Sequence, residues 1–167
     1  MILGMSVAGF TQFHVIISLI AIISGIVVVL GMLGANRMPG MTALFLITTV
    51  ATSVTGFMFP TAFGAADVIG IISLVILALA ILALYTYKLA GAWRGVYVVS
   101  AMAALYLNCF VLVVQSFMKI PFFHALAPTQ KEPPFAVAQG VVLILFIGLG
   151  IAAFKKFRPL ARAYAIA

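Results

Sequence analysis

Few side chains in this sequence can take part in acid–base or coordination chemistry. Its 167 residues include two acids, two histidines and one cysteine. These residues are Asp67, Glu132, His14, His124 and Cys109. The acids and histidines are the available metal ligands, but no two of them have the i, i+4 spacing that places two ligands on one face of a helix. No serine or threonine stands in a motif with a histidine and an acid, so the sequence indicates no catalytic constellation.

Haem is the redox cofactor that a pair of histidines holds between membrane helices. His14 and His124 are the two available axial ligands. His14 lies near the start of an apolar segment and His124 follows a proline in a connection, and this placement argues against haem. Cys109 has no second cysteine as a partner and is expected to be a small buried side chain. The sequence therefore leaves the cofactor unidentified.

Hydroxyl side chains recur at helical spacing beside His14. Ser18 follows His14 by four residues, and Thr52 and Thr55 share one face of a second segment. Small and hydroxyl side chains let membrane helices approach closely and form hydrogen bonds across the pair. We expect these residues to face the interior of the protein, where they serve packing alone or line a small-ligand site.

Two amides lie within a further apolar segment, residues 95–120. Asn108 is near its middle, and Gln115 lies on the same face, about 10 Å away at a rise of 1.5 Å per residue. A primary amide needs several hydrogen-bond partners in a medium without water. The two interpretations are packing between helices and a cavity that holds a ligand or water.

Five apolar segments are long enough to hold these residues inside a bilayer, since about 20 apolar residues cross the hydrocarbon core as a helix. The expected spans are residues 12–35, 41–63, 67–89, 95–120 and 135–154. Turn residues separate them, and residues 64–66 are expected to form a tight hairpin. The longest connection, residues 121–134, contains four prolines and is expected to hold a short interfacial turn at residues 122–126.

The composition supports the same architecture. The chain is 66% hydrophobic and 7% charged, with a mean hydropathy of +1.37. A soluble domain needs more polar side chains to cover its surface. The net charge of +7 does not indicate nucleic acid here, because the cations flank apolar segments as topology signals and headgroup anchors. We therefore predict a single all-α domain in the lipid bilayer, a polytopic bundle of five transmembrane helices that does not bind nucleic acid.

The cations also predict an orientation. Two of them, Lys119 and Lys131, fall on the same side as the N-terminus. The seven on the other side are Arg37, Lys88, Arg94, Lys155, Lys156, Arg158 and Arg162. The positive-inside rule places the N-terminus outside and the C-terminus inside. In a bacterium the protein would lie in the inner, cytoplasmic membrane.

This orientation puts both histidines and both acids in the outer half of the membrane. We expect His14, Asp67 and Gln115 to form one site there, beneath the loop that carries His124. A carboxylate near hydrocarbon needs a partner, and His14 and Lys119 are the nearest of suitable type. The candidate ligand-binding residues are His14, Ser18, Thr52, Thr55, Asp67, Asn108, Gln115 and His124.

Two classes of function are best supported after these exclusions. Phenylalanines gather toward the outer side, and an apolar groove with few hydrogen-bonding groups suits a small quinone-like or lipid-like ligand. The alternative is an accessory or structural subunit of a larger membrane complex, or a homo-oligomer, without a ligand. A small transporter or channel is less well supported because no charge lies at the midplane. A haem-binding redox protein is the weakest alternative.

Overall fold

The computed structural model describes residues 1–60 and 62–159, and every element in this part of the chain is a helix. Five helices are long and apolar enough to cross a membrane, with a π-helical turn continuing the third of them. The elements are α1 (Val7–Leu33), α2 (Pro39–Gly56), α3 (Ala65–Ile81), η1 (Leu82–Thr86), α4 (Trp93–Lys119), α5 (Pro121–Leu126) and α6 (Pro133–Lys156). The all-α prediction and its five long apolar helices are confirmed.

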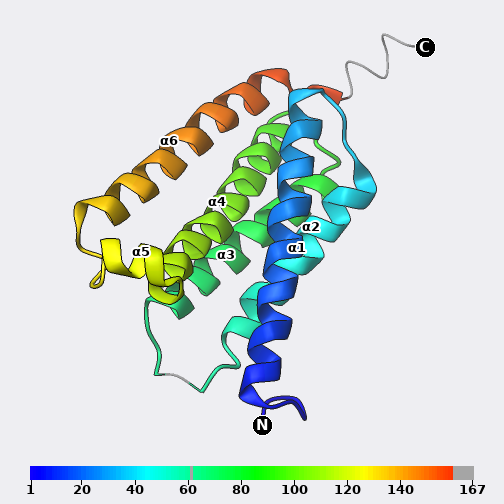
Figure 1. The fold of residues 1–167 in the computed structure, drawn as a ribbon. Helices are drawn as coiled ribbons and strands as arrows, with labels where there is room; N and C mark the ends of the chain where they lie inside the picture. The colour runs from blue at the N-terminus through cyan, green and yellow to red at the C-terminus, as the bar shows by residue number, and fades with distance from the viewer. Residues whose placement is uncertain (61, 160–167) are drawn as a thin grey trace.

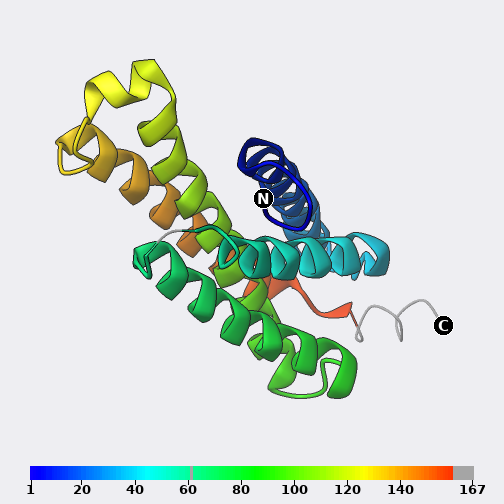
Figure 2. The same ribbon diagram turned by 90° about the horizontal axis from the view of Figure 1, so that it is seen from below.

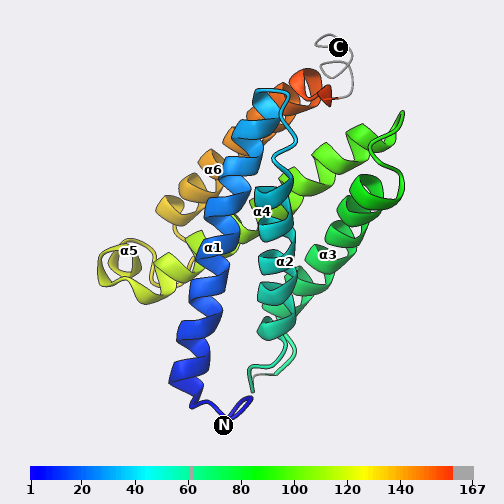
Figure 3. The same ribbon diagram turned by 90° about the vertical axis from the view of Figure 1, so that its right-hand side faces the viewer.

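The long helices alternate in direction, so the start of α1 and the close of α6 lie at opposite ends of the bundle (Figure 1). One end holds the start of α1, residues 57–64 and α5, and we call it the N-terminal end. The other end, called the C-terminal end, holds residues 34–38, residues 87–92 and the close of α6 (Figures 1 and 3). Six of the seven cations predicted on one side lie at the C-terminal end, and Arg162 lies outside the described residues.

The core lies where α1, α2, α3 and α4 meet. Phe45, Leu77, Val98 and Leu105 are almost fully buried within one continuous apolar cluster. Gly25 of α1 lets the helices approach closely, because a Cβ atom there would lie 2.6 Å from Leu105 Cδ1 and 2.9 Å from Phe45 Cδ2. The middle of the bundle is therefore closely packed around a glycine, as small residues allow in membrane helices.

Helix α6 is peripheral by comparison. It runs beside α4 (Figure 2), and Ala153 is its one buried residue. Figure 3 shows α3 and α6 on opposite flanks of α4. Most large apolar side chains of α6 are exposed, including Ile144, Ile147 and Ile151. This surface suits contact with lipid, because it offers hydrocarbon and few polar groups.

Two helix boundaries differ from the sequence prediction. Helix α1 begins at Val7, five residues before the predicted start, because Ser6 caps it by accepting a hydrogen bond from the Gly9 amide at 3.1 Å. Helix α2 ends at Gly56, well before the predicted residue 63. Pro60 lacks an amide and disfavours helical geometry before it, so the chain leaves the helix in a series of turns.

The predicted tight hairpin at residues 64–66 is wrong in extent. The connection runs from residue 57 to residue 64, and α3 begins at Ala65. Asp67 accepts a hydrogen bond from the Gly64 amide at 2.8 Å, which fixes the first turn of α3. Where a short interfacial turn was predicted at residues 122–126, the structure has the short helix α5, which begins at Pro121.

Candidate functional site

His14 is held between α1 and α2 by a side-chain hydrogen bond. Its Nδ1 atom lies 2.7 Å from the hydroxyl oxygen of Thr55. The Thr55 hydroxyl also lies 2.7 Å from the Ala51 carbonyl oxygen, to which it donates. A threonine hydroxyl has one proton, so its oxygen is left to accept from His14 Nδ1–H. The helical spacing of Ala51 and Thr55 thus selects the histidine tautomer, and Nε2 becomes the acceptor of the ring.

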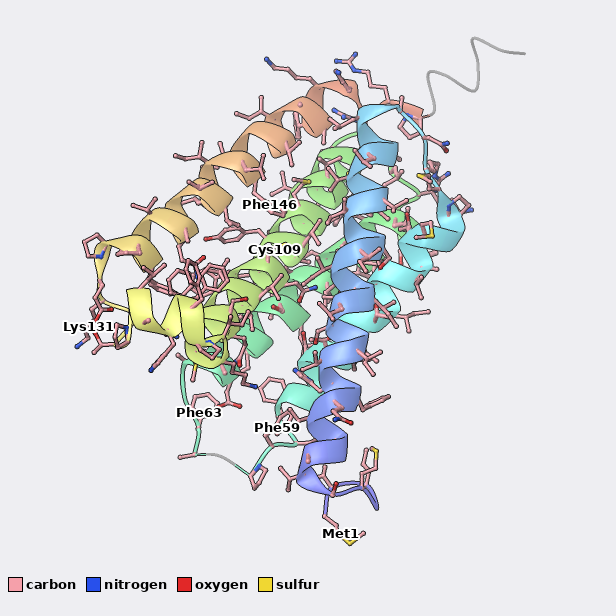
Figure 4. The ribbon with its side chains drawn as sticks, in the orientation of Figure 1. Met1, Phe59, Phe63, Cys109, Lys131 and Phe146 are labelled. Carbon is pink, nitrogen blue, oxygen red and sulfur yellow. The ribbon has the colours of Figure 1, made fainter. Side chains whose placement is uncertain are left out.

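Aromatic rings and one cation surround this histidine. The Phe59 ring meets the His14 ring edge-on, with centroids 5.3 Å apart, and Phe59 in turn contacts buried Phe10 at 5.2 Å. Figure 4 shows Phe59 beside the N-terminal part of α1. Lys119, at the end of α4, lies close enough to act electrostatically on His14. The site therefore combines an apolar wall, an acceptor nitrogen and a nearby positive charge.

One turn deeper, Ser18 and Thr52 continue the contact between α1 and α2. The Ser18 hydroxyl donates to the His14 carbonyl oxygen at 2.7 Å, and its oxygen lies 3.3 Å from Thr52 Oγ1. His14 is thus held twice, through its backbone carbonyl by Ser18 and through its ring by Thr55. The four residues predicted on these two faces lie together in the structure.

The two amides of α4 have different surroundings. Asn108 donates to Thr49 Oγ1 at 3.3 Å, which joins α4 to α2. Gln115 has a buried carbonyl oxygen without a hydrogen-bond partner among the described residues, and so does Gln139 of α6. Gln139 donates its amide nitrogen to the Phe110 carbonyl oxygen at 3.2 Å. An unpaired buried acceptor costs about 1–3 kcal/mol, so these two oxygens are where a water or a ligand donor would be stabilising.

Asp67 and His124 form their hydrogen bonds outside this network. Asp67 binds the Gly64 amide at the start of its own helix. His124 Nδ1 lies 3.3 Å from the Phe117 carbonyl oxygen, so α5 is tied to the end of α4. Within the described residues, no hydrogen bond or ion pair joins Asp67 or His124 to His14 or Gln115. Asp67 thus serves as a helix cap, and the shared site of His14, Asp67 and Gln115 stays a prediction.

Several contributors to the site were missed in the sequence. Thr49 is fully buried and receives Asn108, and Phe10 is fully buried behind Phe59. Their signal is weak, because a threonine or phenylalanine in an apolar helix is usually ordinary packing. Gln139 was also missed, although a glutamine four residues inside an apolar span is the kind of side chain that needs a partner. Within residues 1–60 and 62–159, no three His, Cys, Asp or Glu side chains converge to hold a metal ion.

The five apolar helices define the class of the molecule: it is a multi-pass integral membrane protein. The sequence matches no family model, and comparison with curated proteins and with solved structures finds no similar chain.

Proposed function

We propose that this membrane protein binds a small, mainly apolar ligand that carries a hydroxyl donor, of the quinol type, with His14 Nε2 as its acceptor. The observation that carries the proposal is the hydrogen bond between His14 and Thr55. It commits Nδ1–H to the protein and leaves Nε2 without a protein partner among the described residues. An acceptor of this kind, half-buried in an apolar setting, is favourably paired by a ligand hydroxyl.

The surroundings of His14 suit such a ligand. Half-buried Phe59, supported from behind by fully buried Phe10, supplies aromatic surface against which a flat ring can pack in edge-on or offset geometry. Lys119 supplies a positive charge on the α4 side, which favours an electron-rich oxygen on the ligand. Pockets of this class are lined mainly by apolar side chains with a small number of placed polar groups.

We further propose that the N-terminal end, and with it His14, faces the outside. The C-terminal end carries most of the cations, and Tyr87 and Trp93 stack there with ring centroids 3.8 Å apart. Cations on the cytoplasmic side and aromatic rings at the headgroup level are typical of that interface. Thiol labelling of intact cells tests the orientation in a Cys109→Ala background. Label should reach Lys131→Cys and not Lys155→Cys, and the reverse pattern would refute it.

Ligand binding is tested by titrating the protein in nanodiscs with a short-tailed ubiquinol, followed by calorimetry. We expect saturable binding by the wild type. The oxidised quinone lacks the hydroxyl donors and should bind about tenfold more weakly, equivalent to about 1.4 kcal/mol. His14→Phe keeps a ring of similar size but removes both nitrogens, and it should lose a similar factor in affinity.

A matched pair of threonine variants separates the tautomer argument from general packing. Thr48 and Thr55 both donate to the carbonyl four residues earlier at 2.7 Å, but Thr55 alone of the two receives His14. Thr55→Val should weaken quinol binding, while Thr48→Val should leave it unchanged. Equal binding by wild type, His14→Phe and Thr55→Val would overturn the proposal.

The exposed face of α6 favours a second candidate, an accessory subunit that packs against a larger membrane complex or another copy of itself. Among the five long helices, α6 buries the smallest share of its apolar window. Gentle extraction followed by native mass spectrometry distinguishes the two. A larger assembly without a bound small molecule would favour the accessory role, and a single chain with a stoichiometric ligand would favour ligand binding.

A further inference from the structure

A groove of about 430 Å³ lies between α4 and α6, apart from the site at His14. Its lining is apolar except for Tyr106 and Lys155. Figure 4 shows Phe146 of α6 directed toward α4 in this region. The α6 residues along its edge, Leu143, Ile147 and Ile151, are exposed, so the groove opens to the surrounding bilayer.

Hydrogen bonds join α4 to α6 at each end of the groove and leave the space between them open. Toward the C-terminal end, Arg94 donates to the Phe154 and Phe157 carbonyl oxygens at 2.8 Å each. Toward the N-terminal end, Gln139 binds the Phe110 carbonyl oxygen. Between these contacts the helices present small residues to each other, Ala103 and Gly150. A Cβ atom on Gly150 would have Met102 Cγ, at 4.0 Å, as its nearest neighbour, so space remains there.

The length of the groove corresponds to one leaflet. Its lining on α6 extends from Leu143 to Lys155. At 1.5 Å per residue this stretch is about 18 Å long, against roughly 15 Å for half of the hydrocarbon core. An apolar groove of this depth, open along its side, has the dimensions of a single extended acyl chain.

Charge at the mouth of the groove selects the headgroup. Lys155 lines it there, and Arg94 lies over the Phe154 ring at 5.1 Å. Lys156 and Arg158 follow in the chain, and both acids of the sequence belong to the opposite end, at Asp67 and Glu132. Basic side chains beside a bilayer attract anionic lipid headgroups.

We propose that the groove between α4 and α6 holds one acyl chain of an anionic phospholipid, whose phosphate is bound by Lys155 at the mouth. The apolar lining accounts for the chain, and the basic cluster without a nearby acid accounts for the headgroup. This lipid is distinct from the ligand proposed at His14, because the groove belongs to α4 and α6 and lies toward the other end of the bundle.

The test uses nanodiscs with equal amounts of phosphatidylglycerol and phosphatidylcholine that carry identical chains. The protein is extracted into mild detergent and weighed by native mass spectrometry. We expect one retained phosphatidylglycerol per chain, favoured about fivefold over phosphatidylcholine. Lys155→Gln should abolish this preference, whereas Lys131→Gln, at the opposite end, should keep it.

Two glycines of α6 provide the steric control. Gly150→Leu fills the groove and should remove most of the retained lipid. Gly148→Leu adds the same side chain where no atom lies within 4 Å, outside the groove lining, and should retain the lipid. Ala103→Leu fills the groove from α4 and should repeat the loss if Gly150→Leu folds poorly. Equal retention by all variants, or equal retention of both phospholipids by the wild type, would overturn the proposal.

Discussion

The contacts between α1 and α2 differ in kind from the contacts between α4 and α6. Between α1 and α2, side chains bind along the interface, from His14 with Thr55 to Ser18 with Thr52. Between α4 and α6, polar contacts lie on either side of an apolar groove. Hydrogen bonds along an interface fix the position of one helix against the other. Where the hydrogen bonds lie only beyond the two ends of a groove, the space between the helices can hold a lipid chain.

The difference also separates two kinds of site. At α1–α2 the hydrogen bonds orient a ring nitrogen, which is a requirement for selecting a ligand by its donor. At α4–α6 the groove supplies an apolar surface with Lys155 at its mouth, and these are the features that the proposed anionic phospholipid requires. Variants that act on one pair and spare the other test this division.

The largest effect on stability is expected from adding a side chain at Gly25, where α1 packs closely against its neighbours. Gly25→Leu would force a side chain into the space held by Leu105 Cδ1, 2.6 Å from the new Cβ atom, and by Phe45. We expect a loss of about 3 kcal/mol or more in stability, the upper range for an overpacked core. Thermal unfolding in detergent, followed by circular dichroism, measures it. Gly148→Leu on α6 is the control and should unfold at the same temperature as the wild type. Similar losses of stability in both variants would contradict the comparison.

The next effect concerns the polar contact of α4 with the end of α6. Arg94→Gln removes a guanidinium that donates to the Phe154 and Phe157 carbonyl oxygens. Hydrogen bonds from a charged donor are strong, so we expect a loss of about 2 kcal/mol in the stability of this contact. Hydrogen exchange should quicken in the last turn of α6 and stay unchanged in α1. Lys88→Gln, in the neighbouring connection, should have no such effect, and unchanged exchange in Arg94→Gln would show that the contact is unimportant.

A smaller effect is expected at Asn108, which extends the polar network from α2 to α4. Its hydrogen bond to Thr49 Oγ1, at 3.3 Å, should contribute about 0.6 kcal/mol, the average for such bonds in membrane helices. A double-mutant cycle with Asn108→Leu and Thr49→Val measures the coupling. Additive losses would mean that the two side chains do not stabilise each other.

The smallest effect should occur at Glu132, which precedes α6. Desolvation alone would raise the pKa of this carboxyl, but hydrogen bonds from Thr129 and the Lys131 amide lower the pKa below its usual value of 4.5. A pKa that is lower in the folded state gives stability that is present above 4.5 and lost as the pH falls through the folded value. NMR shifts of the Thr129 and Lys131 amides should titrate with a midpoint below 4.5, and Glu132→Gln should remove the titration. A midpoint at or above 4.5 would contradict this.

Much of the fold was predictable because membrane helices are encoded by length and hydrophobicity. Each of the five spans is a long apolar segment, and the short turn expected at residues 122–126 coincides with helix α5. The end of α2 was misplaced because residues 57–63 remain apolar after the helix has ended. The π-helical turn at Leu82–Thr86 has no sequence signal, since it differs from an α-helix in hydrogen bonding and not in composition.

The site was predictable only in part. Helical spacing put His14 and Ser18 on one face and Thr52 and Thr55 on another, and the structure joins these two faces. Depth in the membrane also suggested Asp67 as a partner of His14, but a residue at the right depth can still lie on another helix and bind its own backbone. The α4–α6 groove could not be foreseen, because periodicity describes one helix at a time and does not say which helices are neighbours.

Nitrogen-15 NMR of histidine-labelled protein tests the central claim most directly, because it reports which ring nitrogen of His14 carries the proton. His14→Gln assigns the signals by removing one set. The structure predicts a protonated Nδ1 and an unprotonated Nε2, with the Nε2 signal shifting when short-tailed ubiquinol is added. Thr55→Val should mix the two tautomers, and Thr48→Val should not. A ring protonated at Nε2 alone, with a signal that ignores the quinol, would contradict the account.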